Sequence, residues 1–318
     1  MKHSILFFIS LVIPNIYAID FNQVVIWGYQ PHSHTHAYIH AAFARTFIAL
    51  GYKTLWLSAS NDVADIDFAN SLFITEGQVD DCIPLRDDCW YIIHNCNQEK
   101  YKDLLANNRC IILQVYTHDV LERNTQKIEP CIHYDIPKKT IYMPWATDLL
   151  PEEIDRIKET IILPKQPYAA FIGTINNGYF GNLPEIHAFK RACAEKNIPF
   201  IHKTKINIDE TIKLTRDVVM APAIQGFWQV EKGYIPCRIF KNISYGAFGM
   251  TNSKTVWELF DKKIIYNPDC YQLFYDGQKY LKKATLDDLF KLMDIVKNNH
   301  TYVNRINHLL TFFDATQS

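Results

Sequence analysis

The strongest constraint on the fold is an alternation of apolar runs and helical patterns that begins at Val24 and occurs twice along the chain. Short apolar runs predict buried strands, and the amphipathic stretches between them predict crossover helices of a parallel sheet. In the first part the strands are expected at 24–29, 54–58, 71–75, 89–95 and 110–116, with helices at 36–50 and 98–108. This pattern predicts one Rossmann-like domain.

The same pattern restarts after a polar, proline-bounded segment and a helix that follow residue 140. Strands are expected at 168–175, 198–204, 217–224, 256–260 and 262–267, with helices at 182–197, at 270–280 and, as closing helices, across 285–313. A chain of 318 residues is long enough for two domains. The sequence therefore predicts an α/β protein of two domains, 19–163 and 164–318, with the boundary near Pro164.

The first eighteen residues have the pattern of a secretory signal peptide. A cationic start is followed by an apolar run, Ile5 to Ile13, and by a small residue, Ala18, at the expected cleavage point. The run is shorter than the roughly 20 residues that span a bilayer, so no stable membrane span is expected. We expect 1–18 to direct the chain to the secretory pathway or out of the cell. A cytoplasmic location follows if the segment is not recognised.

Charge and cysteine content narrow the classes of partner. The net charge is −1, which gives no electrostatic footprint for nucleic acid or for an anionic membrane. The eight cysteines include no CxxC pair and no zinc-binding pattern, and no cofactor motif of the GxGxxG type follows the first strand. The pair Cys82 and Cys89 is compatible with a disulfide or with buried thiols.

The stretch 233–253, GYIPCRIFKNISYGAFGMTNS, predicts a short two-faced helix and then a short strand. Pro236 suits the first turn, and Gly246 with Gly249 can end the helix after about three turns. Helical spacing separates an apolar stripe of Phe240, Ile243 and Ala247 from a polar face of Arg238, Lys241, Asn242 and Tyr245.

Two cations early in this helix predict an anion beside it. Arg238 and Lys241 would lie near the positive end of the helix dipole, which costs roughly 0.3–1 kcal/mol per charge unless an anion compensates. Free backbone N–H groups at the helix start add donors for a phosphate. The polar end of the following strand, Thr251, Asn252 and Ser253, is expected beside the same opening.

The run RIFKNISYGAFGMTNS resembles the donor-side helix and strand of GT-B glycosyltransferases whose second domain carries an Arg-x-Phe-Glu-x-x-x-x-Gly-Ala-like motif. Arg238, Phe240, Gly246 and Ala247 match, and Lys241 stands where the family has a ribose-binding glutamate. The resemblance implies two Rossmann-like domains facing a cleft, with the donor on the second. Gly173 and Thr174, where strand 168–175 leaves the carboxyl edge of the sheet, are expected at this cleft, because open α/β sheets bind ligands at that edge.

Histidines after the first strand are the candidates for acid–base chemistry. In some GT-B enzymes this loop supplies the acceptor-side base, and His34 or His36 suits that role because histidine has a pKa of about 6.5. His36 and His40 share a helix face and allow a metal site as an alternative, but the expectation is no metal. The triplet Asp65-Ile66-Asp67 matches a metal-binding DxD pattern in letters only.

These features predict a metal-independent glycosyltransferase that needs no cofactor and uses a nucleotide sugar. The acceptor is expected to be a glycan, lipid or protein rather than nucleic acid. Two alternatives stay open. A signal peptide and two hinged α/β domains also describe an exported solute-binding protein, and Lys241 in the glutamate position is compatible with a transferase-derived pseudoenzyme.

Overall fold

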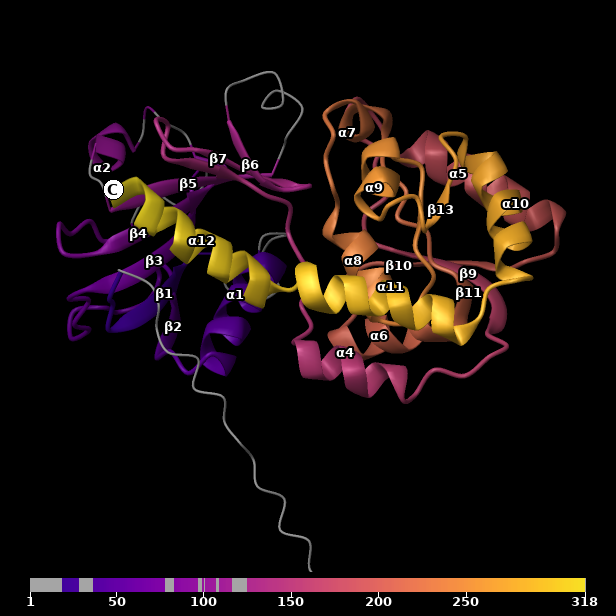
Figure 1. The fold of residues 1–318 in the computed structure, drawn as a ribbon, viewed down its shortest axis with the longest axis horizontal. Coiled ribbons are helices and arrows are strands. Elements are labelled where there is room, and N and C mark those ends of the chain that lie inside the picture. Colours follow the sequence, from indigo (N-terminus) through magenta and orange to yellow (C-terminus); the bar gives the residue numbers. More distant parts are fainter. Residues whose placement is uncertain are drawn as a thin grey trace, which may run out of the picture.

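The computed structural model describes residues 19–28, 37–77, 83–96, 99, 101–106, 109–115 and 125–317. Two α/β halves lie side by side (Figure 1). The signal-peptide segment, His34, His36 and Cys82 lie outside the described residues. No helix in the part that the structure describes is both long and apolar enough to span a membrane.

The first half is built on an eight-stranded sheet with the order β2-β1-β3-β4-β5-β8-β7-β6. The strands are β1 (Gln23–Trp27), β2 (Thr54–Leu57), β3 (Ser71–Glu76), β4 (Trp90–His94), β5 (Cys110–Gln114), β6 (Gln126–Glu129), β7 (Ile132–Asp135) and β8 (Thr140–Tyr142). The helices between them are α1 (Ala37–Ala49) and α2 (Lys102–Ala106). Strands β1 to β5 and β8 pair in parallel, which agrees with the expected crossover pattern.

Both faces of this sheet are buried because neighbouring strand residues enter different clusters. Val24 and Ile26 join the large core that continues into the second half, whereas Val25 and Trp27 pack in a smaller cluster with Leu104 of α2. Burial on both faces explains why β1 reads as a continuous apolar run instead of an alternating one. Cys89, beside this smaller cluster, is a buried free thiol.

The second half has shorter strands and more helix. Its strands are β9 (Gln166–Ile172), β10 (Phe200–Lys203), β11 (Val218–Met220), β12 (Met250–Thr251) and β13 (Ile265–Tyr266), paired as β10-β9-β11 and β12-β13. A bridge between Ala223 and Thr251 connects the two small sheets. Its helices are α4 (Pro151–Lys158), α5 (Leu183–Glu195), α6 (Ile208–Asp217), α7 (Phe227–Glu231), α8 (Cys237–Ser244), α9 (Lys254–Leu259), α10 (Cys270–Leu281) and α11 (Leu286–Asn299).

One expected strand is wrong, and a hairpin and a helix were not predicted. The segment 256–260 lies in α9 and at its end, not in a strand, because the Ser253 hydroxyl accepts the N–H of Val256 and caps a helix there. The antiparallel hairpin β6–β7 was not expected from the sequence because β6, QKIE, is polar and mostly exposed. Helix α6 was missed as well.

The chain crosses between the halves at two adjacent places. It leaves the first sheet after Tyr142, and α4 packs beside α11, so the first crossing precedes the boundary expected near Pro164. The last helix, α12 (Tyr302–Gln317), returns across the first sheet (Figure 1). The two crossings meet where the Thr147 N–H donates to the His300 carbonyl at 3.0 Å.

A buried arginine fixes this double crossing. The guanidinium of Arg305, on α12, is 1% exposed and donates to the carbonyls of Pro144 at 2.8 Å and Asn299 at 3.0 Å. Carbonyl acceptors from both crossings therefore surround one cation, and these hydrogen bonds offset the cost of burying its charge. The cleft described next lies beside this anchor.

Candidate functional site

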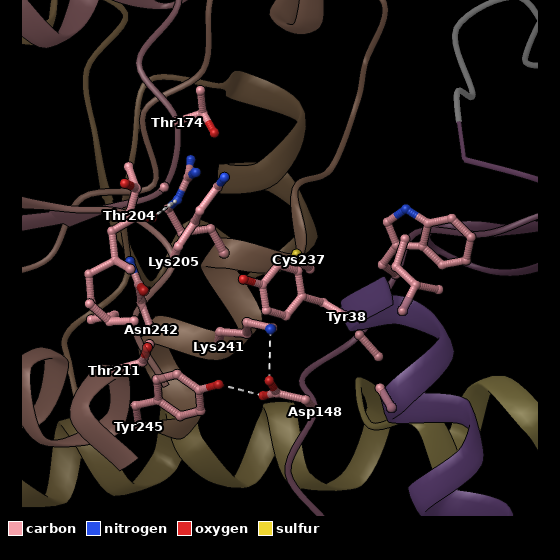
Figure 2. Close-up of a pocket in the computed structure, with 18 of the residues that line it drawn as sticks. Tyr38, Asp148, Thr174, Thr204, Lys205, Thr211, Cys237, Lys241, Asn242 and Tyr245 are labelled. Carbon is pink, nitrogen blue, oxygen red and sulfur yellow. Dashed lines mark hydrogen bonds and ion pairs between the residues drawn. The ribbon is translucent and has the colours of Figure 1, made fainter. Parts of the chain in front are cut away.

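A cleft of about 870 Å³ lies between the two halves. The first half and the crossing supply Tyr38, Ile39, Ala42, Trp145, Ala146, Asp148 and Tyr302. The second half supplies Ile172, Gly173, Thr174, Thr204, Lys205, Ile206, Thr211, Tyr234, Cys237, Arg238, Lys241, Asn242 and Tyr245. Figure 2 shows Tyr38 of α1, Asp148 of the crossing and Lys241 of α8 converging on the cleft.

Helix α8 presents its polar face to this cleft. All four residues of the expected polar face line the cleft, and the expected apolar stripe of Phe240, Ile243 and Ala247 is buried. The helix is shorter than expected, because Pro236 is its N-cap and it ends at Ser244. Lys241 is therefore in the last turn, where the helix dipole favours a cation.

Arg238 is held by backbone carbonyls and by an aromatic ring. Its Nε donates to the Ile172 carbonyl at 3.0 Å, and its guanidinium carbon lies 4.2 Å from the centre of the Phe171 ring. No carboxylate among the described residues pairs with it. Burial lowers the pKa of Arg238 from its ordinary value, although an arginine stays charged at neutral pH. Its charge is therefore available to an anion in the cleft.

Gly173 provides the space that this guanidinium occupies. Its φ is +137°, and a Cβ built there would come within 2.3 Å of Arg238 Nη2. The glycine comes directly after β9, as the sequence predicted. A larger residue at this position would fill the space that the Arg238 guanidinium occupies. Gly173 and Arg238 are thus one structural unit of the cleft wall.

Lys241 already has an anion within the protein. Its Nζ lies 2.7 Å from Oδ2 of Asp148, and the hydroxyl of Tyr245 donates to Oδ1 of the same carboxylate at 2.5 Å. Burial alone would raise the pKa of Asp148, but the ammonium and the hydroxyl hold it below its ordinary value. The sequence suggested that the anion beside Lys241 is a ligand; the structure supplies it from the crossing.

Four further polar residues of the second half line the cleft and were not expected. Thr204 and Lys205 follow β10, Thr211 lies on α6, and Tyr234 precedes α8. Lys205 is exposed and takes part in no ion pair of the described residues. The signal was present for the first two, because they lie at the end of a predicted strand, at the ligand-binding edge of the sheet.

Four of the expected donor-side residues do not line the cleft. Gly246, with φ of +95°, follows α8 and packs near Ile161. The others are buried in local hydrogen bonds: Thr251 with Ala223, Asn252 with the backbone of Gln225, and Ser253 as the cap of α9. We therefore leave these four out of the candidate site. Asn242 lines it, but its amide donates to the Ala221 carbonyl at 2.7 Å.

The first half brings another pair of histidines together near the cleft. His40 Nε2 and His94 Nε2 are 3.0 Å apart, both side chains are fully buried, and the His94 ring packs edge-on against Trp145. No group of three or more metal-binding side chains occurs among the described residues. The Asp65 and Asp67 carboxylates lie in an exposed loop that does not contribute to the cleft.

Comparison with known proteins supports the fold. No protein-family model matches the sequence. No curated protein matches it either. Among solved structures, an alpha-glucosyltransferase in complex with UDP and a 13-mer DNA containing a HMU base has a TM-score of 0.62 at 9% identity, covering 92% of this chain and 100% of that one. An alpha-glucosyltransferase in complex with UDP-glucose and DNA containing an abasic site has a TM-score of 0.57 at 9% identity, covering 90% of this chain and 98% of that one.

A third similar structure is OtsA in its apo form, with a TM-score of 0.50 at 10% identity, covering 92% of this chain and 98% of that one. Its likeness and those of the alpha-glucosyltransferases extend over both halves of the chain. The chain has the GT-B fold of these glycosyltransferases, as the resemblance of its donor-side helix implied.

Proposed function

We propose that this protein is a glycosyltransferase that takes a sugar from a nucleotide-activated donor. The observation that carries the proposal is the guanidinium of Arg238, which backbone carbonyls fix in the wall of the cleft and which forms no ion pair with a carboxylate of the described residues. The solved structures with this fold include complexes with UDP and with UDP-glucose, which makes a uridine nucleotide the first donor to test.

The diphosphate is expected between Arg238 and Lys205. Both residues line the cleft, and neither is paired with a carboxylate of the described residues. Lys241 contributes less to phosphate binding than the sequence suggested, because its charge is balanced by Asp148 at 2.7 Å. Two cations can stabilise the leaving phosphate without a metal. Transfer that continues at full rate in excess chelator would support metal independence.

His34 and His36 stay the proposed acceptor-side base. The support is their position in sequence, between β1 and α1, because α1 begins at Ala37 and its residues Tyr38 and Ile39 line the cleft. A histidine there can take a proton from an acceptor hydroxyl at neutral pH. The acceptor is accordingly expected on the first half.

The class of acceptor includes nucleic acid as well as glycan, lipid and protein. Similar solved structures hold DNA, which outweighs the earlier argument from a net charge of −1. Incubation with labelled UDP-glucose and either DNA containing a HMU base or a panel of oligosaccharides separates these acceptors by where the label appears.

The decisive test is titration with UDP by calorimetry, for the wild-type chain and for Arg238→Ala. Loss of a charged hydrogen bond is expected to weaken binding by about 1.5–3 kcal/mol, or roughly 10- to 150-fold. The control is Arg191→Ala, which removes an exposed arginine of α5 outside the cleft. Unchanged affinity in Arg238→Ala would remove this residue from the donor site.

Activity then separates transferase from the alternatives. Donor binding together with hydrolysis or transfer of the sugar supports the enzyme. Binding of UDP with no turnover of any nucleotide sugar would indicate a pseudoenzyme. Stabilisation by free sugars or amino acids, but by no nucleotide, would favour a solute-binding protein.

A further inference from the structure

Asp148 is a carboxylate that the crossing segment delivers into the cleft. Its side chain is 16% exposed and lines the cavity, between α1 of the first half and α8 of the second (Figure 2). Its main-chain carbonyl accepts a hydrogen bond from Arg45 of α1 at 2.8 Å. Contacts from both halves therefore fix its backbone and its side chain.

The rest of the cleft is rich in hydrogen-bond donors. The charged or hydroxyl-bearing side chains that line it are Tyr38, Thr174, Thr204, Lys205, Thr211, Tyr234, Arg238, Lys241, Tyr245 and Tyr302. Asp148 is the one carboxylate among the described residues of the lining. Cations and hydroxyls suit phosphate oxygens, whereas a ligand hydroxyl that donates a proton is best received by the carboxylate.

The carboxylate has acceptor capacity left. Each of its oxygens offers about two lone-pair sites. Lys241 takes one site on Oδ2 and Tyr245 takes one on Oδ1, which leaves about one on each oxygen. Two acceptor sites on neighbouring oxygens match two hydroxyls on adjacent carbons.

The ionic state of the group agrees with this use. Burial would raise the pKa of Asp148, but the charge of Lys241 and the hydrogen bonds from Lys241 and Tyr245 outweigh it and lower that pKa. Asp148 is therefore an ionised carboxylate at neutral pH, which accepts hydrogen bonds and has no proton to donate. Its low basicity favours recognition of hydroxyls over removal of their protons.

We propose that Asp148 recognises a vicinal diol of the bound donor, with Lys241 and Tyr245 acting as positioning residues that hold its carboxylate. This inference rests on the proposed function, because it takes the ligand to be a nucleotide sugar. Two parts of such a donor carry a vicinal diol, the ribose and the transferred hexose. The chemistry is the same for both, and the choice of ligands below distinguishes them.

The experiment compares three ligands by calorimetry in wild type and in Asp148→Asn. The ligands are UDP, its 2′,3′-dideoxy analogue, and UDP-glucose. If the ribose is the target, wild type loses about tenfold or more in affinity for the dideoxy analogue, and Asp148→Asn shows no such difference. If the hexose is the target, wild type prefers UDP-glucose to UDP, and the variant loses that preference.

The pattern across ligands, not the loss of affinity itself, tests the role. A purely structural effect of Asp148→Asn lowers the affinity for all three ligands by the same factor and leaves both preferences intact, which would overturn the inference. Failure of wild type to bind any of the three ligands would instead contradict the proposed function. Asp148→Glu, which keeps a carboxylate, is expected to restore part of the preference.

Two further variants separate the role of the Asp148 carboxylate from side effects of its removal. Asp148→Asn leaves the Lys241 ammonium without its counter-ion, so the double variant with Lys241→Met is measured beside it and is expected to lack the same preference. The matched control is Asp294→Asn, which removes a half-exposed carboxylate of α11 that pairs with Lys158 and Lys297 outside the cleft. Wild-type preferences are expected there.

Discussion

The two walls of the cleft differ in chemistry. The helix of the first half that faces the cleft contributes Tyr38, Ile39 and Ala42, none of them charged, whereas the second half contributes Lys205, Arg238 and Lys241 among the described lining residues. The cationic wall suits an anionic part of a ligand, and the uncharged wall suits ring faces or other apolar surface. Under the proposed function, we therefore expect the phosphates of a donor on the second half and the group that accepts the sugar on the first half.

The two halves also differ in what holds them together. The first has a continuous sheet whose central strands are fully buried. The second has strands of two to seven residues, and side chains complete its hydrogen bonding: Asn252 to Gln225, and Asn242 to Ala221. Local polar contacts to the backbone are therefore part of what holds the second half together.

The largest expected effect tests whether the first half serves the transfer step while the second half binds the nucleotide. His34→Ala or His36→Ala is predicted to lower the rate of sugar transfer by about 10²- to 10⁴-fold, the usual contribution of a general base, while UDP affinity stays at the wild-type value. Single-turnover rates and calorimetric titration measure the two quantities separately. Arg238→Ala, in contrast, should lower the affinity for UDP. A full rate in both histidine variants would place the base elsewhere.

The next effect tests the polar anchors of the second half. Asn252→Ala removes two hydrogen bonds to the Gln225 backbone, of 2.9 and 2.8 Å, at a buried position, and is predicted to lower the free energy of unfolding by ~2–3 kcal/mol. Its counterpart in the first half is Asn22→Ala, which removes an exposed bond to Ala69 and should change stability by less than about 0.5 kcal/mol. Urea denaturation measures both. Equal losses would contradict the contrast between the halves.

The smallest effect concerns Lys165, which donates to the carbonyls of Arg216 and Gly246 at the ends of two helices. Lys165→Met is predicted to cost ~1–2 kcal/mol because buried carbonyls lose their donor. The exposed Lys213→Met of α6 is the control and should have little effect.

The pH dependence gives Lys165 a second signature. Burial lowers its pKa to about 8, below the ~10.4 of an unfolded chain. Between these values the unfolded state binds the proton more strongly, so the contribution of Lys165 to stability rises with pH from about 8 to about 10.4. The difference in unfolding free energy between wild type and Lys165→Met should grow across that range. A constant difference would contradict the lowered pKa.

Much of the fold follows from the sequence where apolar runs decide it. Strands β1, β3, β4 and β5 occur where the pattern predicted them, because burial on both faces leaves an uninterrupted apolar run. The partly buried β2 and the helices α1 and α5 also occur at their predicted places. The pattern failed where tertiary contacts decide. The polar strand β6 forms by pairing with β7, and the cap at Ser253 turned an apolar run into α9.

The part of the cleft that the sequence predicted is mainly the part that helix α8 contributes. Spacing alone assigned the polar face of α8, and the order of strands assigned Gly173. Asp148 could not be found, because it lies in a crossing without periodicity and its partners Lys241 and Tyr245 are nearly a hundred residues away. A charge that meets its counter-ion only in the folded chain looks unpaired in the sequence. That explains why Lys241 suggested a phosphate.

The return of α12 to the first sheet has a consequence for biosynthesis. Phe313 packs edge-on against Trp90, and the Tyr134 hydroxyl donates to the carbonyl of His308, so the first half is complete only when α12 is present. Domains usually fold in the order in which they leave the ribosome. Here the half that is translated first must wait, with an apolar face uncovered, until all of the other has been translated. Uncovered apolar surface of this kind makes incompletely folded chains prone to aggregate.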